Sequence, residues 1–381
     1  MNTITLFQPS RIVFGDGCAS RCAEFLAQRG CKRVLLVVGA AVIPLIEGII
    51  DNLKRSGLTV ITAPTINREP TISDFKSISQ VALMETVDSV LGTGGGSVID
   101  VAKLVAALAN EHQAVTDVFG INLLNSRKLP VVCLPTTAGT GAEVSPNAIL
   151  LDEADELKKG VVSPYLVPDA AFVDPLLTLS VPPQVTAATG LDALTHCIEA
   201  YANKFAHPIV DTYAIQGIKL ITANLLRAVR DGGDIQARNA LALGSLYGGL
   251  CLGPVNTAAV HALSYPLGGR FHVAHGISNA VLLPHVLRFN YSAAPERYAE
   301  ISSAMGMERN GSTLADAEKA VKFIVQLSRD CGVPQKLSDF GISQEVIPSL
   351  AQSAMKVTRL LKNNLRPLTE EDAVQIYNAA F

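Results

Sequence analysis

The chain has 381 residues, enough for two domains that each bury a full core, with 49% hydrophobic residues, 17% charged residues and a formal net charge of −3. This charge provides no broad attraction for phosphate backbones or anionic lipid, so we expect no nucleic-acid partner. Seven cysteines without a CxxC pair favour reduced thiols in a cytoplasm, and no apolar run of about 18 residues predicts a membrane span.

The first half of the chain has the pattern of an α/β domain. Residues 1–15 alternate as a strand does and lack the basic start and apolar core of a signal peptide. Up to about residue 180, short β-rich runs then alternate with helical patterns, and these runs are 34–38, 60–64, 87–92, 129–135 and 170–175. The alternation predicts βαβ units that build a parallel sheet.

The second half has a different pattern. Beyond residue 181, Ala, Leu and Ile recur at three- and four-residue spacing, with breaks at 207–208, 231–234 and 332–334. We therefore expect an α/β domain with a parallel sheet over residues 1–181 and an all-α domain over residues 182–381.

A glycine cluster follows the third β-rich run. Gly94, Gly95 and Gly96 precede Ser97 and a helical pattern. Glycines let a ligand approach the backbone, and the amides at a helix start attract an anion such as pyrophosphate, while Ser97 is a candidate cap for that helix. A plain tight turn between strand and helix remains the alternative, because glycine loops are common.

A second polar loop, residues 135–147, follows another buried strand. Its hydroxyls at Thr136, Thr137 and Thr140 are candidates for binding phosphate or ribose, although such a segment alone is more often an ordinary turn. Both loops follow apolar strands, which places them at the carboxyl edge of the predicted sheet, where open α/β folds bind ligands.

Four residues of the second half are candidate metal ligands. Asp192 and His196 are one helical turn apart, so their side chains project together, and His261 and His275 follow downstream. Three neutral imidazoles and one carboxylate form an ordinary ligand set for a divalent first-row metal. For Asp192 and His196 alone, a buried polar pair without chemistry is an equal alternative, whereas all four together favour a metal.

Five motifs in this order resemble the iron-containing, or group III, alcohol dehydrogenase family. They are GGGSVIDVAK (94–103), PTTAGTGAEV (135–144), TAATGLDALTHCIEAY (186–201), VHALSYPLGG (260–269) and AHGISNAVLLPHV (274–286). The resemblance covers essentially the whole chain. It implies the dehydroquinate synthase-like fold: a nicotinamide-dinucleotide-binding α/β domain, a helical metal-binding domain and a cleft between them.

The resemblance also implies roles for individual residues. Metal, usually Fe(II) and sometimes Zn(II), is held by residues matching Asp192, His196, His261 and His275. NAD or NADP contacts match Gly95, Gly96, Ser97, Asp100, Thr136, Thr137, Thr140, Ser145 and Lys158, with Lys159 the alternative to Lys158. Asn147 falls where relatives line the substrate pocket.

Departures from the family pattern carry further expectations. Gly39 stands where many relatives have an aspartate that holds the adenosine ribose, so space is left for a 2′-phosphate and NADP(H) is expected to be accepted. Tyr265 replaces a histidine that often follows the third ligand. His272 is the candidate for proton exchange, and a histidine that is merely exposed or packed is the alternative.

We expect reversible hydride transfer between NAD(P) and a small primary alcohol, diol or aldehyde, in a cytoplasmic homodimer or larger homo-oligomer. One rival is a dehydrogenase of a small hydroxy acid, or a semialdehyde reductase, with Arg270 as the cation for the carboxylate. Another rival is a nucleotide- or metal-binding protein without turnover.

Overall fold

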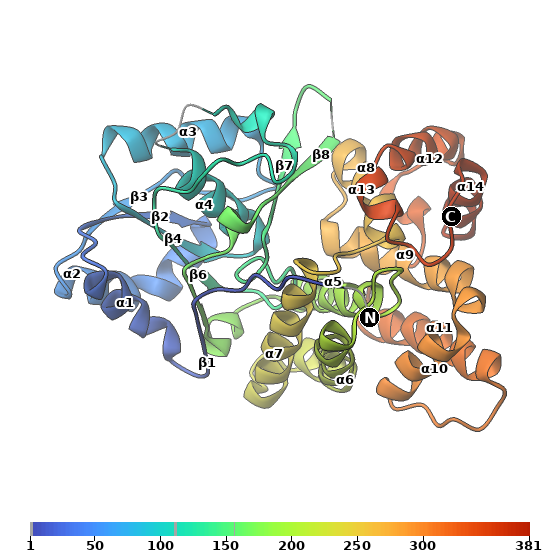
Figure 1. The fold of residues 1–381 in the computed structure, drawn as a ribbon. Coiled ribbons are helices and arrows are strands. Elements are labelled where there is room, and N and C mark those ends of the chain that lie inside the picture. Colours follow the sequence, from blue (N-terminus) through green and yellow to red (C-terminus); the bar gives the residue numbers. More distant parts are fainter. Residues whose placement is uncertain (1–2, 110–112, 156) are drawn as a thin grey trace. The chain divides into compact units, whose positions relative to one another are not determined.

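The computed structural model describes residues 3–109, 113–155 and 157–381. Contacts between Cα atoms divide the chain into two compact units. We call residues 6–137 and 141–180 the sheet unit, and residues 1–5, 138–140 and 181–381 the helical unit. Figure 1 shows strands flanked by helices in the first and helices in the second.

The sheet unit is built on a six-stranded parallel sheet with the order β1-β9-β6-β4-β2-β3. Its strands are β1 (Arg11–Phe14), β2 (Arg33–Val38), β3 (Thr59–Thr62), β4 (Ser89–Gly94), β6 (Val131–Pro135) and β9 (Ala170–Val173). All five β-rich runs of the sequence are therefore strands of one parallel sheet, and the predicted fold class of an α/β half followed by an all-α half is confirmed.

Four helices cover the two faces of this sheet. They are α1 (Cys22–Gln28), α2 (Glu47–Arg55), α3 (Ile72–Met84) and α4 (Gly96–Leu108). Leu35 and Val37 of β2 share a core with α3 and α4, whereas Val34, Leu36 and Val38 share the opposite core with α1 and α2. Successive side chains of a strand point to opposite faces, so a strand covered on both sides is apolar on both faces, as β2 is from Val34 to Val38.

A small second sheet completes this unit and was not predicted. It has the order β5-β8-β7, with β7 (Asn147–Asp152) antiparallel to β8 (Leu157–Val162), and β5 (Gly120–Ile121) parallel to β8. The segment 157–162 reads LKKGVV, and its two lysines and glycine hide the strand from a search for apolar runs.

The strand prediction for residues 1–15 is only partly right. The strand comprises β1 alone, residues 3–10 carry no strand, and the first two residues lie outside the described residues. Pro9 has no amide hydrogen to donate to a ladder and stands just before β1.

The helical unit contains α5 to α14. Their bounds are α5 (Pro183–Tyr201), α6 (Pro208–Arg230), α7 (Ile235–Leu252), α8 (Ala259–Phe271), α9 (His275–Asn290), α10 (Pro295–Ala304), α11 (Thr313–Asp330), α12 (Ile347–Met355), α13 (Thr358–Leu361) and α14 (Glu370–Ala379). The predicted break at 207–208 is the start of α6, and the breaks at 231–234 and 332–334 fall between helices. Polar caps mark several starts: the side chains of His207, Asp234 and Ser312 accept from backbone amides at the beginnings of α6, α7 and α11.

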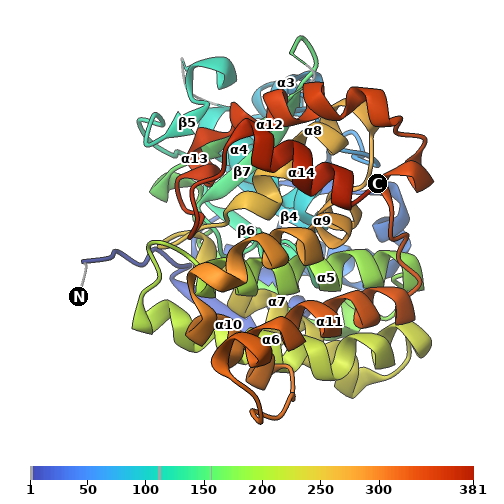
Figure 2. The same cartoon turned by 90° about the vertical axis from the view of Figure 1, so that its right-hand side faces the viewer.

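Helix α5 is the central helix of this unit and is buried along nearly its whole length from Thr186 onward. It packs against α6, α7 and α9, while α12 packs against α8 and α14 (Figure 2). A helix enclosed on all sides reads as apolar all round, so a carboxylate or an imidazole inside it must be hydrogen-bonded or bind a cation.

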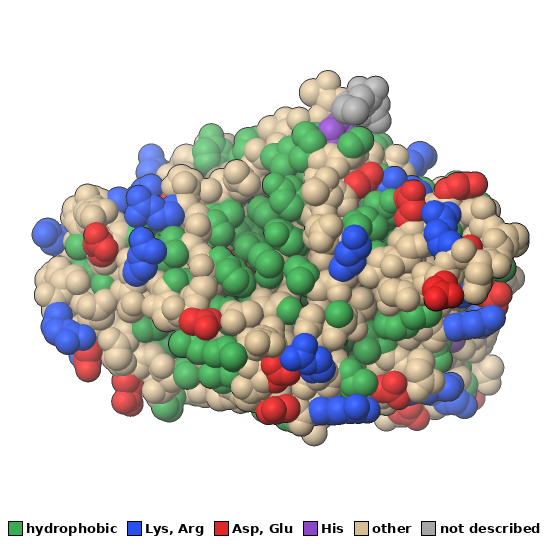
Figure 3. Space-filling view, turned by 90° about the horizontal axis from the view of Figure 1, so that it is seen from below, with side chains coloured by type: hydrophobic (Ala, Val, Ile, Leu, Met, Phe, Trp, Pro, Cys, Tyr) green, Lys and Arg blue, Asp and Glu red, His purple; other side chains and the backbone are tan. Residues whose placement is uncertain are grey.

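The surface matches the modest net charge. On the face drawn in Figure 3, lysine and arginine side chains are interspersed with aspartate and glutamate. Within the described part of the chain, no helix combines the length and apolar character that a bilayer crossing requires.

Candidate metal centre and nucleotide loops

Helices α5, α8 and α9 bring the four candidate ligands of the helical unit together. Asp192 and His196 occupy successive turns of α5, His261 lies in the first turn of α8, and His275 is the first residue of α9. Asp192 Oδ1 is 3.6 Å from Nε2 of both His261 and His275, and 4.0 Å from Nε2 of His196.

Three of these side chains form a compact cluster of donor atoms. The ligand atoms of Asp192, His261 and His275 all lie within 4.8 Å of one another. His196 lies directly beside them, because its ring stacks on that of His261 with centroids 4.7 Å apart. Asp192, His196 and His261 are buried, and His275 is partly exposed.

The protonation of these groups suits a bound cation. Burial lowers the pKa of His196 to about 4, which keeps its ring neutral and its lone pair free. Burial also opposes ionisation of Asp192, but the neighbouring His196 and His275 outweigh it and hold the pKa of this carboxyl well below its usual range. Burial lowers the pKa of His261 as well, yet its contacts with Asp192 and Glu199 win and raise it to about 9. Two buried carboxylates thus favour positive charge at this point: the metal-free chain carries it as the protonated ring of His261, and a divalent cation would supply it in that ring's place.

The side-chain amide of Asn279 lies among the same donor atoms. Its Nδ2 is 2.7 Å from Asp192 Oδ1, 3.1 Å from His261 Nε2 and 3.3 Å from His275 Nε2. Among the described residues its Oδ1 is buried without a hydrogen-bond partner. The amide group, with its partly positive hydrogens, therefore points to where the ligand atoms converge, and the residues present fit a metal ion of the first row.

The sequence pattern missed Asn279 and Glu199. Both were recoverable from helical spacing, because Asn279 is four residues after His275, and Glu199 is three residues after His196 and seven after Asp192. Each therefore lies on the same helical stripe as a ligand.

Three other residues near the ligand segments were singled out from the sequence. Tyr265 is buried, and its ring centroid is 6.3 Å from that of His275. His272 caps the end of α8 in the left-handed conformation, with φ of 54°, and is exposed. Arg270 is also exposed, and its Nη1 donates to Ser349 Oγ at 2.7 Å. A guanidinium engaged in this way gives the hydroxy-acid alternative no specific support.

The glycine loop joins β4 to α4. Gly94 ends the strand and Gly95 is the N-cap of the helix, which no side chain caps. The prediction that Ser97 caps α4 is therefore wrong, since the helix begins at Gly96 and already includes Ser97. Val98 N already bonds to Gly95 O, so among the described residues of the first turn the amides of Gly96 and Ser97 remain available to an anion.

The second polar loop starts beside the first. Thr136 N donates to Gly94 O at 3.0 Å, because β4 and β6 are neighbours in the sheet. A Cβ placed on Gly95 would lie 3.4 Å from Thr137 Oγ1. Gly95, Gly96, Ser97, Thr136 and Thr137 thus line adjacent strand ends. Thr140 belongs by its contacts to the helical unit.

Asp100 and Lys103 bind the protein itself. Lys103 is fully buried, and its Nζ donates to the carbonyl oxygens of Ala142, Ser145 and Asn147. Asp100 accepts from Ile149 N at 3.0 Å and lies 3.4 Å from Lys103 Nζ. The two side chains tie α4 to the second loop and to β7, so Ser145 and Asn147 are held in place through their backbone oxygens.

Lys158 rather than Lys159 is the buried lysine of β8. Its Nζ is 2.7 Å from Glu69 Oε1, and only 3% of its side chain is exposed. Lys159 instead pairs with Asp152 at 2.7 Å and with Asp155. Glu69 is the counterion of Lys158.

Gly39 directly follows β2, in extended backbone. A Cβ at this position would lie 3.1 Å from Ile66 O, so a side chain here requires a small shift of the segment after β3. The adjacent Ala40 N donates to Asn67 Oδ1 at 2.9 Å, which joins the two loops at this edge of the sheet.

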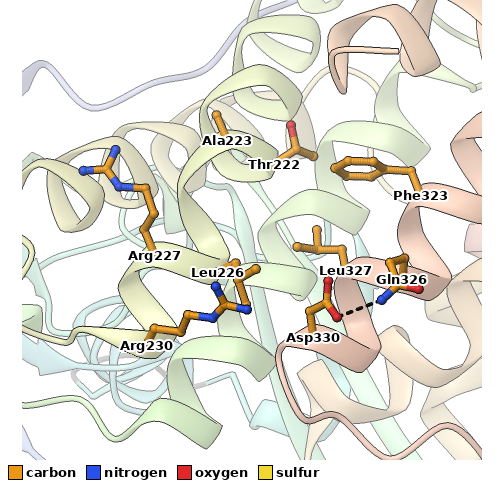
Figure 4. Close-up of a pocket in the computed structure, with 9 residues that line it drawn as sticks. All are labelled: Thr222, Ala223, Leu226, Arg227, Arg230, Phe323, Gln326, Leu327 and Asp330. Carbon is orange, nitrogen blue, oxygen red and sulfur yellow. Dashed lines mark hydrogen bonds between the residues drawn. The ribbon is translucent and has the colours of Figure 1, made fainter.

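The surface of the helical unit also carries a groove of about 320 Å³ between α6 and α11 (Figure 4). Two of its charged residues already have partners, because Asp330 accepts from Gln326 and Arg227 pairs with Asp234. The groove contains none of the candidate ligands or loop residues described above.

Comparison with known proteins agrees with the fold and the donor set. Residues 9–175 match the family described as iron-containing alcohol dehydrogenase, and residues 186–381 match the C-terminal part of the Fe-containing alcohol dehydrogenase family. Long-chain-alcohol dehydrogenase 1 of Geobacillus thermodenitrificans (strain NG80-2) is 39% identical, over 98% of this chain and 97% of that protein. The 1,3-propanediol dehydrogenase of Citrobacter freundii is 36% identical, with the same shares covered.

The solved structures agree. A crystal structure of a 1,3-propanediol oxidoreductase superposes with a TM-score of 0.96 at 35% sequence identity, over the whole of both chains. An alcohol dehydrogenase from Oenococcus oeni superposes with a TM-score of 0.95 at 33% sequence identity, also over the whole of both chains. The fold and these matches define an oxidoreductase that interconverts alcohols and aldehydes with a nicotinamide cofactor. The chain belongs to the iron-containing alcohol dehydrogenase family, as its motifs indicated.

Proposed function

We propose that Asp192, His196, His261 and His275 hold one divalent cation, Fe(II) in the native enzyme and Zn(II) as a substitute, and that the enzyme oxidises a small primary alcohol or diol reversibly. The observation that carries this proposal is the convergence of Asp192 Oδ1 with Nε2 of His261 and His275, each 3.6 Å away. Three imidazoles and one carboxylate are donors that suit a divalent first-row metal such as Fe(II).

When bound, the cation supplies Lewis acidity towards an alcohol or aldehyde oxygen, and the nicotinamide ring accepts or returns the hydride. The chain's own contribution is to keep the ligand atoms ready. His196 stays neutral because it is buried, and Asp192 stays ionised because imidazoles surround it. Burial also excludes water, which strengthens every electrostatic contact within the site.

We propose that residues 1–181 form the domain that binds the dinucleotide. Gly95, Gly96 and Ser97 contact the pyrophosphate through their amides, as the uncapped start of α4 suggests. The hydroxyls of the second loop (Thr136, Thr137, Thr140 and Ser145) and Lys158 make the remaining contacts. Asp100 contributes indirectly, since it is engaged with Ile149 and Lys103.

NADP(H) is the cofactor that the Gly39 edge favours. Position 39 is a glycine and carries no carboxylate, so it does not repel a 2′-phosphate. The neighbouring loop provides a cation, Arg68. Asn67 Oδ1 accepts a hydrogen bond from Ala40 N in the loop that follows Gly39. The next residue, Arg68, has 63% of its side chain exposed and forms an ion pair with Asp74. A strong preference of the wild type for NADH, measured as the ratio of kcat/KM for NADPH and NADH, would contradict this assignment. Gly39→Asp and Arg68→Ala are both expected to lower that ratio.

For the substrate, we propose a small primary alcohol or diol and the corresponding aldehyde. The relatives named for long-chain alcohols and for 1,3-propanediol span the chain lengths to compare. Asn147 is the proposed polar contact, because its Oδ1 is buried without a hydrogen-bond partner among the described residues.

Proton exchange with water is assigned to His272, which is exposed at the end of α8. Replacing His272 by alanine is expected to change the pH dependence of kcat. An unchanged profile would remove this role, and Tyr265, which faces His275, would be the next residue to replace.

Two properties of the whole molecule complete the proposal. We infer a cytoplasmic homodimer or larger homo-oligomer, and the reduced, buried state of all seven cysteines supports the reducing compartment. Light scattering coupled to size exclusion gives the number of subunits, and a monomer would contradict the inference.

The decisive experiment is an anaerobic panel of alcohols, diols and aldehydes with both nicotinamide cofactors. Chelation should abolish turnover and added Fe(II) should restore it. Turnover that survives complete removal of metal would refute the proposed centre, and a chain that binds metal without any turnover would be a binding protein only.

A further inference from the structure

We propose that Glu199 is a positioning residue that fixes the orientation and tautomer of His261 towards the metal. This inference rests on the metal site proposed above. It assigns a function to a buried carboxylate of α5 that has no place in the ligand set itself.

Glu199 forms hydrogen bonds with two consecutive residues at the start of α8. Its Oε1 accepts from Val260 N at 2.6 Å, and its Oε2 is 2.6 Å from His261 Nδ1. Only 5% of the Glu199 side chain and 3% of the His261 side chain are exposed. One carboxylate thus holds both the backbone and the ring of the same helical turn.

The position of Glu199 on α5 makes these two hydrogen bonds possible. It lies on the same stripe of α5 as Asp192 and His196, so the helix that provides two ligands also provides the partner of a third. Helix α8 has no side-chain cap of its own at Ala258, and the first-turn amide of Val260 finds its acceptor in Glu199. The carboxylate therefore couples the placement of α8 to that of the ligands on α5.

The chemical consequence concerns the two ring nitrogens of His261. A carboxylate only accepts hydrogen bonds, so Nδ1 must carry a hydrogen and donate it to Glu199. When the ring is neutral, Nε2 then has a free lone pair, and this is the atom that lies 3.6 Å from Asp192 Oδ1. A carboxylate behind a ligating histidine keeps the ring from rotating and makes it a stronger donor.

A cap for α8 would also explain the bond to Val260, so the test must separate the two roles. Glu199→Gln keeps the size and one oxygen that can accept from Val260 N. Its NH₂ group can only donate, so it would make Nδ1 the acceptor and move the hydrogen of His261 to Nε2, where it blocks the metal. This variant preserves the cap and reverses the tautomer.

The measurement is Co(II) binding to the full chain stripped of metal, by competition with a chromophoric chelator and by the visible Co(II) spectrum. Glu199→Gln is expected to weaken Co(II) binding by about 10- to 100-fold and to alter the spectrum. The matched control is Asp316→Asn, which removes the charge of another buried carboxyl of the helical unit, one that pairs with Lys319, and which should leave both readouts unchanged.

A second pair of variants tests whether the effect passes through His261. In a His261→Ala background, Glu199→Gln should change Co(II) affinity by less than about 2-fold, because the ring it orients is absent. An equal loss in both backgrounds would overturn the proposal, as would wild-type affinity in Glu199→Gln. If Glu199→Gln does not fold, Glu199→Asp takes its place, and affinity equal to that of Asp316→Asn would then refute the inference. A wild-type chain that binds no Co(II) would instead refute the proposed metal site.

Discussion

Replacing Glu143 by glutamine is expected to stabilise the chain at pH 8 and to leave its stability nearly unchanged at pH 5. Glu143 lies in the loop between β6 and β7 and is 3% exposed. Burial raises the pKa of its carboxyl from 4.5 to about 7, against the smaller opposing effects of a backbone hydrogen bond and of Lys103. The folded chain therefore retains this proton at a pH where the unfolded chain has lost it.

The sign and size of the effect follow from this difference. Between about pH 4.5 and pH 7 the unfolded chain binds fewer protons than the folded chain, so the free energy of unfolding falls as the pH rises. At about 1.4 kcal/mol per pKa unit, the loss reaches about 3 kcal/mol and is complete by about pH 8. Glutamine has nearly the shape of the protonated acid and cannot ionise, so the variant escapes this loss.

The assay is urea unfolding of the metal-free chain at several values between pH 5 and pH 8. The difference between Glu143→Gln and wild type should grow with pH and level off near pH 8. Glu345→Gln, at an exposed position, is the control and should stay within about 0.5 kcal/mol of wild type throughout. A constant difference at every pH, or a variant less stable than wild type at pH 8, would refute the reasoning.

Three further predictions concern packing and charge. Gly276→Ala should lower the free energy of unfolding in urea by about 1–3 kcal/mol and weaken Co(II) binding, because the added Cβ would lie 2.3 Å from Ala188 O of α5. Gly48→Ala is the control: its Cβ would enter open space in α2, so this variant should be neutral or stabilising. Asn279→Asp places a second carboxylate against Asp192, so the metal-free chain should melt at a lower temperature and added Co(II) should raise its melting point by more than in wild type; an equal rise would contradict this. Lys103→Met should destabilise the chain by about 3–5 kcal/mol, because it removes the fully buried cation that pairs with the partly buried Asp100. Lys76→Met on the exposed side of α3 should have little effect, and similar losses in both variants would count against the Asp100–Lys103 pair.

Much of the sheet unit follows from local pattern. Residues 34–38 of β2 are all apolar because both faces of the strand are covered, and such runs are recognisable without any knowledge of their partners. The hairpin of β7 and β8 escaped detection because Lys158 and Lys159 interrupt the pattern. Each lysine is stabilised there by a carboxylate, Glu69 or Asp152, which only the folded chain brings close.

The loop residues divide in the same way. The glycines predicted a close approach of the backbone, and Gly95 does cap α4 without a side chain. Sequence alone could not reveal that Ser97 is inside the helix rather than its cap, or that Asp100 turns towards β7. A shift of the helix start by one or two residues decides whether Ser97 caps the helix or lies inside it. The direction of a polar side chain depends on which nearby backbone group lacks a hydrogen-bond partner in the folded chain.

For the metal centre, the sequence by itself determined the kinds of donor atom and the one-turn spacing of Asp192 and His196, because an α-helix repeats every 3.6 residues whatever surrounds it. Only the tertiary structure decided that α8 and α9 bring His261 and His275 to that stripe of α5, with Glu199 behind one ring and Asn279 among the donor atoms. Periodicity reports which side chains are buried. Which buried side chains meet depends on contacts between helices far apart in the chain, and no local pattern encodes those.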